Sequence, residues 1–342
     1  MAIQVYGSPA GRLRAMAGEI IGHAIFTEVL CSAVKQMEMP KNKSDTMIVR
    51  SWVPYGATVS APNTWSVTAE SHITQEGVTP TPDTVTPRDV TFTLNQYMAL
   101  YSLTDKDFDL YEDDVAAAMK EQTGERMGLV REMAVYGKMK AATNKFFSGG
   151  TSRATVDEGL TERVVSNVVR SLQANHAMKI TKILEPSPNE NTVAVEAAYV
   201  CYVHTDAEYD IRRLPGFREY SAYGSRKVIN MHEIGTWQNV RFIVSADLSP
   251  ILNAGAAVGA TGLKATSTNV DIYPFIFLAK DAFAQVKLRG ENALDPIFVP
   301  VGQKDKNDPG GQRGYIGAKF WHGSEILNQG YMAVVEAGVA AL

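Results

Sequence analysis

The residues of this chain whose types and spacing could do chemistry follow an apolar run near the middle of the sequence. Residues 194–203 are mostly apolar, and His204, Asp206 and Asp210 come within the next seven positions. An imidazole and two carboxylates are groups that bind divalent metal ions. At the carboxyl end of a buried strand they could hold such an ion, so one interpretation is a metal-dependent hydrolase.

A structural interpretation of the same residues is simpler, and we favour it. It predicts that His204 closes the strand and that Asp206 caps a short helix over residues 206–214. Glu208 and Asp210 then lie in the first helical turn, where the helix dipole stabilises carboxylates. On this interpretation the segment binds no metal ion.

The rest of the sequence has no catalytic signature. It lacks the glycine-rich nucleotide-binding and phosphate-binding motifs, the GxSxG turn and the HExxH zinc motif. The two cysteines, Cys31 and Cys201, lie in apolar runs, which predicts buried free thiols instead of zinc ligands or a disulfide. We therefore predict a protein that is not an enzyme, with no catalytic residue, no cofactor and no metal.

Composition sets the outer limits of this interpretation. Of the 342 residues, 45% are hydrophobic and 20% charged, which is enough apolar surface for a sizeable core and excludes a mostly disordered chain. The net charge of -4 gives no overall positive surface of the kind that nucleic-acid readers use. The apolar run 273–279 is far shorter than the roughly 20 residues that a membrane helix needs, so we predict no membrane partner.

An unusual region in the first third of the chain predicts a projecting arm. Residues 46–53 and 88–97 have the β-branched or alternating pattern of strands, whereas residues 54–87 are rich in Pro, Thr, Ser and Gly. A compact domain rarely carries such a long excursion without a function. A partly disordered surface loop is one interpretation, but the apolar side chains favour an arm that packs on a neighbouring subunit. The candidate intersubunit contacts are Trp52, Trp65, Val67, Ile73 and Glu76.

The other elements follow from periodicity and from turn residues. The longest helix is predicted over residues 105–144, with acidic first turns and with glycines at which it could bend. Further helices are predicted over residues 11–37, 161–177, 206–214 and 281–286. Strands are predicted over residues 227–230, 240–245, 271–279, 297–300, 314–321 and 331–336, with a polar linker at 185–191 and flexible loops at 253–269 and 304–311.

The order of these parts resembles that of a tailed-bacteriophage major capsid protein, a fold also found in encapsulin shells and in the floor domain of herpesvirus capsid proteins. More narrowly, the chain is similar to the N4-like, podovirus-type branch. The segments that carry the resemblance are collinear and span most of the chain: Thr74–Pro80 (TQEGVTP), Val90–Tyr97 (VTFTLNQY), Leu103–Asp105 (LTD), Glu233–Ser245 (EIGTWQNVRFIVS), Tyr273–Leu278 (YPFIFL) and Asp295–Pro296.

The resemblance implies an α+β fold divided into four parts. Residues 1–45 would be an N-terminal arm, and residues 46–100 an extended β-hairpin loop that reaches over the adjacent subunit. Residues 101–150 and 295–342 would form a peripheral domain around a long spine helix, and residues 151–294 an α/β axial domain. No arrangement of lysine and asparagine supports a covalent crosslink between subunits.

The resemblance also implies a function and partners. The chain would self-assemble as hexamers and pentamers into an icosahedral head around double-stranded DNA, without sequence-specific binding. Separate scaffolding, portal and decoration proteins would be its other partners, and it would occupy the host cytoplasm during assembly and then the virion. The alternatives are an encapsulin-like nanocompartment shell that encloses a cargo enzyme and, from another class, the hydrolase built on His204, Asp206 and Asp210.

Overall fold

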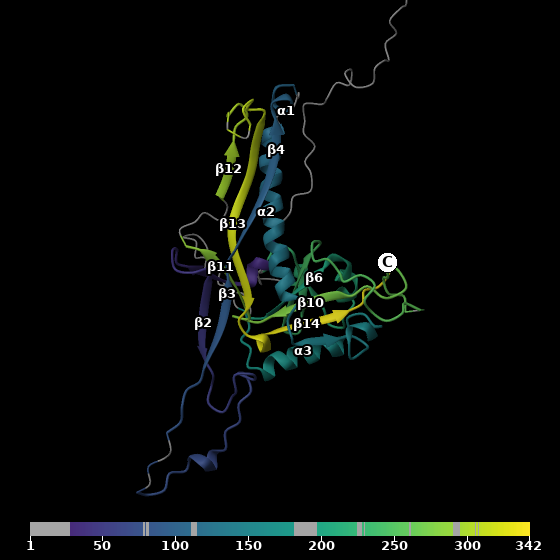
Figure 1. Ribbon diagram of the computed structural model, residues 1–342. Coiled ribbons are helices and arrows are strands. Elements are labelled where there is room, and N and C mark those ends of the chain that lie inside the picture. Colours follow the sequence, from purple (N-terminus) through teal and green to yellow (C-terminus); the bar gives the residue numbers. More distant parts are fainter. Residues whose placement is uncertain are drawn as a thin grey trace, which may run out of the picture.

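The protein is seen in a computed structural model as an upright helix-and-sheet part, a compact α/β part and a long projecting arm (Figure 1). The structure describes residues 28–77, 79, 82–110, 115–180, 197–223, 228, 230–259, 261–289, 295–304, 306 and 308–342. Among these residues no helix has the length and apolar character needed to cross a membrane.

The upright part is built from one long helix and a long antiparallel sheet. Helix α2 (Val115–Met139) runs alongside strands β4 (Asn95–Thr104) and β13 (Arg313–Ile326), and β12 (Asp295–Val299) pairs with the other edge of β13. Helix α1 (Asp105–Leu110) follows β4 directly at the top of this part. The side chains alternate along β4, so that Ala99 packs inward with Met127 of α2 while its neighbours stay exposed.

The compact part is a seven-stranded mixed sheet with both faces covered. Helix α3 (Glu162–Ala174) lies on one face through Val165, Val168 and Leu172, and the C-terminal end of α2 packs on the other. Because both faces are buried, its central strands do not alternate, and the few polar side chains within them, such as Arg241 and Glu336, are buried as well. The strand order is β5 (Lys145–Phe147), β14 (Met332–Ala337), β10 (Tyr273–Leu278), β6 (Tyr199–His204), β9 (Val240–Ser245), β8 (Glu233–Trp237) and β7 (Arg218–Glu219).

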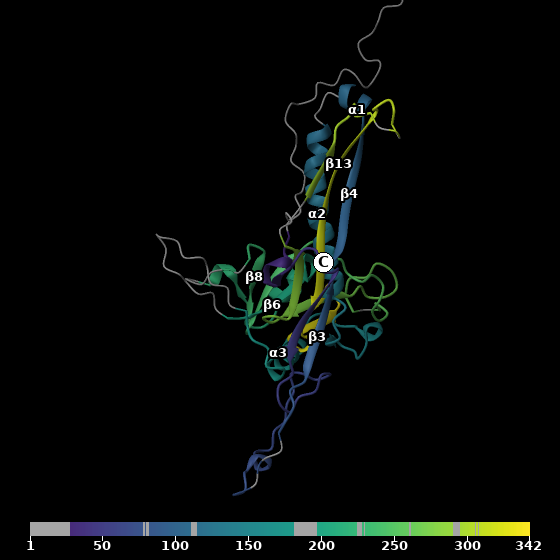
Figure 2. The same cartoon turned by 60° about the vertical axis from the view of Figure 1, so that its left-hand side comes forward.

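The arm leaves the body through a two-stranded hairpin. Strands β2 (Thr46–Trp52) and β3 (Pro87–Thr93) pair antiparallel, and the chain between them projects away from both other parts (Figures 1 and 2). One short 3-10 turn, η2 (Ala69–His72), interrupts it. Both predicted strands and the long excursion between them are therefore confirmed.

Two predicted helices are wrong in part or in full. Of the helix predicted over 11–37, residues 11–27 lie outside the described residues. The rest forms a 3-10 turn, η1 (Leu30–Ala33), and the start of strand β1 (Lys35–Met39). Strand β1 pairs parallel with β11 (Phe283–Leu288), which occupies the helix predicted over 281–286. Strands β1 and β11 are each too short for the periodicity of their side chains to distinguish a strand from a helix. Both are extended because each supplies backbone hydrogen-bond partners to the other.

The remaining predictions agree more closely. Helix α3, strands β9, β10, β12, β13 and β14, and a short helix after His204 (η4, Thr205–Ala207, then α4, Glu208–Arg212) lie where the sequence places them. The helix predicted over 105–144 is observed as α1 and α2, with residues 111–114 outside the described part. The strand predicted at 227–230 has no counterpart at its described residues, Val228 and Asn230, and the linker 185–191 is not among the described residues.

Candidate functional site

The structure does not bring His204, Asp206 and Asp210 together as a metal site. His204 Nδ1 accepts the backbone N–H of Asp206 at 3.0 Å, while the Asp210 carboxylate accepts the backbone N–H of Ala340 at 2.9 Å. Within the described part of the chain, no group of three His, Cys, Asp or Glu side chains could hold a metal ion. The hydrolase interpretation therefore has no geometric support among these residues.

The Asp206 carboxylate has structural partners instead. Lys264 Nζ and the Tyr273 hydroxyl both donate to its Oδ2, at 2.6 and 2.7 Å. The hydrogen bond from Lys264 lowers the pKa of Asp206, although partial burial opposes it. Lys264 belongs to the long loop 253–269, so Asp206 fastens this loop to the carboxyl end of the central sheet. It is His204, and not the predicted Asp206, that caps the turn that follows the strand.

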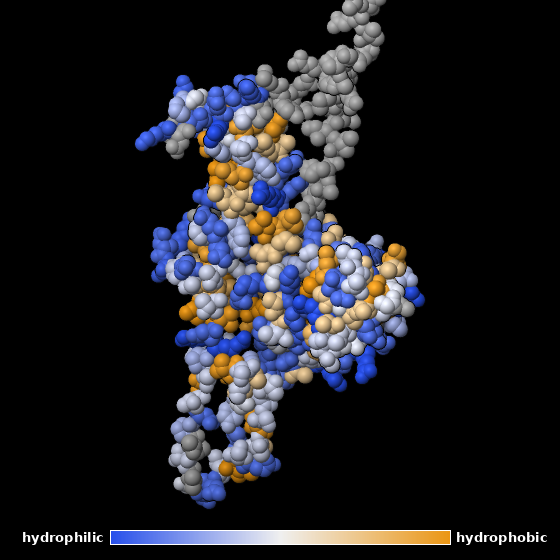
Figure 3. Space-filling view, turned by 45° about the vertical axis from the view of Figure 1, so that its right-hand side comes forward, coloured by the Kyte–Doolittle hydropathy of each residue, from blue (hydrophilic) through white to orange (hydrophobic). Residues whose placement is uncertain are grey.

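The arm is the part of the described chain that most resembles an interface. Trp52 is 62% exposed, Val67 50% and Ile73 73%, and Val85, which the sequence analysis did not single out, is 68% exposed. Isolated orange patches on a white and blue surface mark the arm in Figure 3. Glu76 is exposed near its tip. An isolated subunit gains nothing from holding these apolar side chains in water, so they are a candidate binding surface.

Trp65 differs from the other four candidates because it already has a partner within its own subunit. Its indole stacks on the imidazole of His176, with ring centroids 4.1 Å apart and an interplanar angle of 14°. His176 follows helix α3 with φ of 55°, a left-handed conformation that ends the helix and turns the side chain outward. Sequence reasoning missed this contact, because it joins residues more than 100 positions apart.

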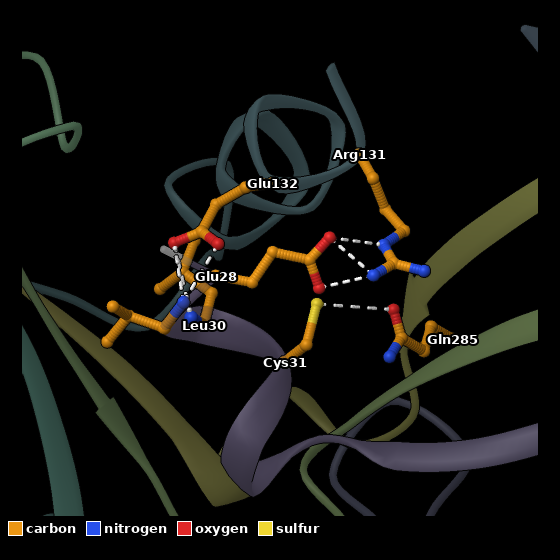
Figure 4. Close-up of polar contacts among 7 residues, drawn as sticks. Glu28, Leu30, Cys31, Arg131, Glu132 and Gln285 are labelled. Carbon is orange, nitrogen blue, oxygen red and sulfur yellow. Dashed lines mark hydrogen bonds and ion pairs between the residues drawn. The ribbon is translucent and has the colours of Figure 1, made fainter. Parts of the chain in front are cut away.

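A second feature that sequence reasoning missed joins the N-terminal segment to the long helix (Figure 4). The buried carboxylate of Glu132, on α2, accepts the backbone N–H of Val29 at 2.9 Å and that of Leu30 at 3.2 Å. These donors are the first groups of the turn η1, where an anion is favourable. Burial raises the pKa of Glu132 to about 7, and the two backbone hydrogen bonds oppose the rise.

Ion and thiol contacts complete this junction. Arg131, next to Glu132 on α2, forms an ion pair with Glu28, the first described residue of the chain. Cys31 donates to Oε1 of Gln285 on β11 at 3.6 Å, and burial raises the pKa of its thiol to about 12. Because the nucleophile is the thiolate, this cysteine is an unreactive, structural thiol. The junction thus joins η1 to α2 and β11.

The arrangement as a whole defines a class of fold. A long helix beside an extended antiparallel sheet, a compact α/β part and a hairpin arm that projects from both form the tailed-phage major capsid protein fold. The predicted fold class is therefore confirmed.

Comparison with solved structures identifies this fold over nearly the full chain. The chain is similar to the capsid of Ralstonia phage GP4 (TM-score 0.67, 11% identity, 99% of each chain covered) and to the cyanophage Pam1 capsid asymmetric unit (TM-score 0.61, 13% identity, 100% of each). It also resembles the capsid of cyanophage P-SCSP1u (TM-score 0.57, 13% identity, 96% of this chain and 94% of the other). The sequence matches no family model and no curated protein. None of the three structures is described as N4-like, so that narrower resemblance stays a prediction.

Proposed function

We propose that this chain is a major capsid protein, which assembles as hexamers and pentamers into the icosahedral head around a phage double-stranded DNA genome. The observation that carries the proposal is the likeness to capsid structures over 99–100% of the chain, arm included. The near-balanced net charge of -4 suits a shell that encloses DNA without binding it tightly. We place the protein in the virion, after assembly in the host cytoplasm.

The arm is the proposed intersubunit contact. Its exposed apolar side chains would be buried against a second copy of the chain, and many copies would multiply a modest gain per contact into a stable shell. Within this proposal residues 1–45 form the N-terminal arm and 46–100 the extended loop. Residues 101–150 with 295–342 form the peripheral domain, and residues 151–294 the axial domain. Separate scaffolding, portal and decoration proteins are the proposed additional partners.

Expression of the full chain followed by light scattering and electron microscopy tests the proposal. We expect closed shells, or hexamers and pentamers that become shells when a scaffolding protein is supplied. A protein that stays monomeric under all assembly conditions contradicts it. Shells that copurify with a cargo enzyme and hold no DNA would instead identify a nanocompartment.

A further inference from the structure

The arm has two physically different parts, which the contacts of its side chains separate. The first, which we call the root, is residues 54–72; the second, the tip, is residues 73–77, 79 and 82–86. Backbone turns fold the root, with Ala57 N–H donating to the Pro54 carbonyl at 3.1 Å and Ala61 N–H to that of Thr58 at 3.1 Å. In the tip, the described apolar residues Ile73 and Val85 are exposed.

A close backbone crossing holds the root together. Gly56 has φ of 77°, and a Cβ there would come within 2.8 Å of the Ser66 carbonyl oxygen. Any other residue at this position would be strained and would push the two runs apart. The ring of Tyr55 contacts His72 edge-on, with centroids 5.5 Å apart, so the two ends of the root also meet.

A reciprocal amide pair docks the root on the body. Asn63 is only 7% exposed, and its Nδ2 donates to Asn328 Oδ1 at 2.8 Å while Asn328 Nδ2 donates to Asn63 Oδ1 at 2.7 Å. Gly330 makes room for it, since a Cβ at 330 would lie 2.1 Å from Asn63 Nδ2. The body therefore leaves space at Gly330 for this side chain of the arm.

Trp65 on His176 is the second attachment, on the end of helix α3. A groove of about 450 Å³ remains between the root and the hairpin, bordered by Trp52, Trp65 and Asn328 among others. Two side-chain pairs among the described residues therefore attach the root to the body. A contact of this kind can be tested by single substitutions.

From these contacts we propose that the root is preassembled within its own subunit, with Asn63 and Trp65 as intrasubunit anchors, and that it presents the tip to a second copy of the chain. The anchors set the direction in which the tip projects before any neighbour is present, so the ordering of the root costs no entropy at assembly. The second half of this inference, the contact of the tip with a second copy, rests on the proposed function. The first half, the attachment of the root to its own body, concerns the isolated subunit.

Amide hydrogen exchange on the full chain, kept below the concentration at which shells form, tests the first half. We expect the root amides of Ala57, Ala61 and Thr64 to exchange more slowly than tip amides such as that of Thr74. Asn63→Ala removes the amide pair from the arm side, and Gly330→Ala fills the space that the Asn63 side chain occupies on the body. Loss of the buried amide pair is expected to speed root exchange about tenfold in both variants.

Ile73→Ala, a substitution in the tip, is the matched control and should leave root exchange unchanged. Root amides that exchange as fast as tip amides in the wild-type subunit overturn the inference. So does unchanged root exchange in both the Asn63 and the Gly330 variants. Electron microscopy of the same protein, concentrated above the point at which shells are expected, keeps the two proposals apart. A protected root in the subunit without shells at high concentration contradicts the function alone, and shells with an unprotected root in the subunit contradict this inference alone.

Discussion

Two buried carboxylates show how burial and partners set the charge of a residue. Glu132 accepts backbone N–H groups but meets no cation among the described residues, and burial raises its pKa to about 7. Burial alone would also raise the pKa of Glu336, but hydrogen bonds from Arg153 and Lys145 outweigh it and hold this pKa below its usual range. Both side chains are buried, so the partners of each carboxylate decide the direction of its shift.

For Glu132 we predict a stability that rises as the pH falls. The folded state holds a proton between the unfolded pKa near 4.5 and the folded pKa near 7, whereas the unfolded state does not. The free energy of unfolding should therefore be larger at pH 5.5 than at pH 8 by a term on the order of 2 kcal/mol. Glu132→Gln should lose this term, and urea unfolding of both proteins at the two pH values measures it. Equal pH dependence in both would contradict the prediction.

For Glu336 the sign is opposite. Its folded pKa is depressed, so its ion pairs stabilise the fold above the unfolded pKa near 4.5, and this stability is lost as the pH falls through the lower folded value. Glu336→Gln should cost about 1–3 kcal/mol at pH 7, since Arg153 and Lys145 then lose a charged partner. The difference from wild type in thermal unfolding should shrink below pH 4. A difference that is the same at every pH would show that packing, and not charge, is responsible.

At the scale of elements, glycines in the long helix α2 differ from a glycine in the sheet in the space around them. Gly124 and Gly137 lie within α2, and a Cβ at either would meet no atom within 4 Å. Gly317 lies in β13, where a Cβ would approach the Ala99 carbonyl oxygen to 2.4 Å. Of these three glycines, only Gly317 is required by a close approach of the backbone.

We therefore predict opposite effects of glycine-to-alanine substitution in the two elements. Gly124→Ala and Gly137→Ala should each raise the free energy of unfolding by about 0.5–1 kcal/mol, because alanine lowers the entropy of the unfolded chain and favours the helix. Gly317→Ala, the control, should lower it. Chemical denaturation of the unassembled subunit measures all three. Destabilisation by both helix substitutions would show that α2 needs its glycines in the folded subunit.

For the whole molecule, the arm offers a direct test of which residues bind a neighbour. Ile73→Ser combined with Val85→Ser removes two exposed apolar side chains from the tip, so the stability of the subunit should not change. Shell formation, followed by light scattering and electron microscopy, should be strongly reduced, because the tip then loses the apolar side chains of Ile73 and Val85 that it would bury.

Val67→Ser is the matched control for this prediction. Val67 is similarly exposed but lies in the root, so shells should still form. Assembly that survives the tip substitutions would contradict the tip as the intersubunit contact. Loss of assembly with Val67→Ser would show instead that the neighbour binds the root.

The sequence by itself determined the features that depend on composition and local pattern. The apolar run 271–279 predicted the strand that is observed as β10, the turn residues of 54–87 predicted a projecting arm, and the periodicity of 161–177 predicted helix α3. Each of these signals comes from residues close together in the chain, where burial and turn geometry act directly on residue type.

Only the tertiary structure decided features whose partners are distant in sequence. Strands β1 and β11, about 250 residues apart, are extended because they pair with each other, although each segment alone was predicted as helix. Glu132 finds its N–H donors 103 positions away. Trp65, a predicted intersubunit contact, also stacks on His176 of its own chain, which its local sequence does not indicate. Exposure and apolar character can be read locally, but the surface that a side chain meets is set by the folded chain as a whole.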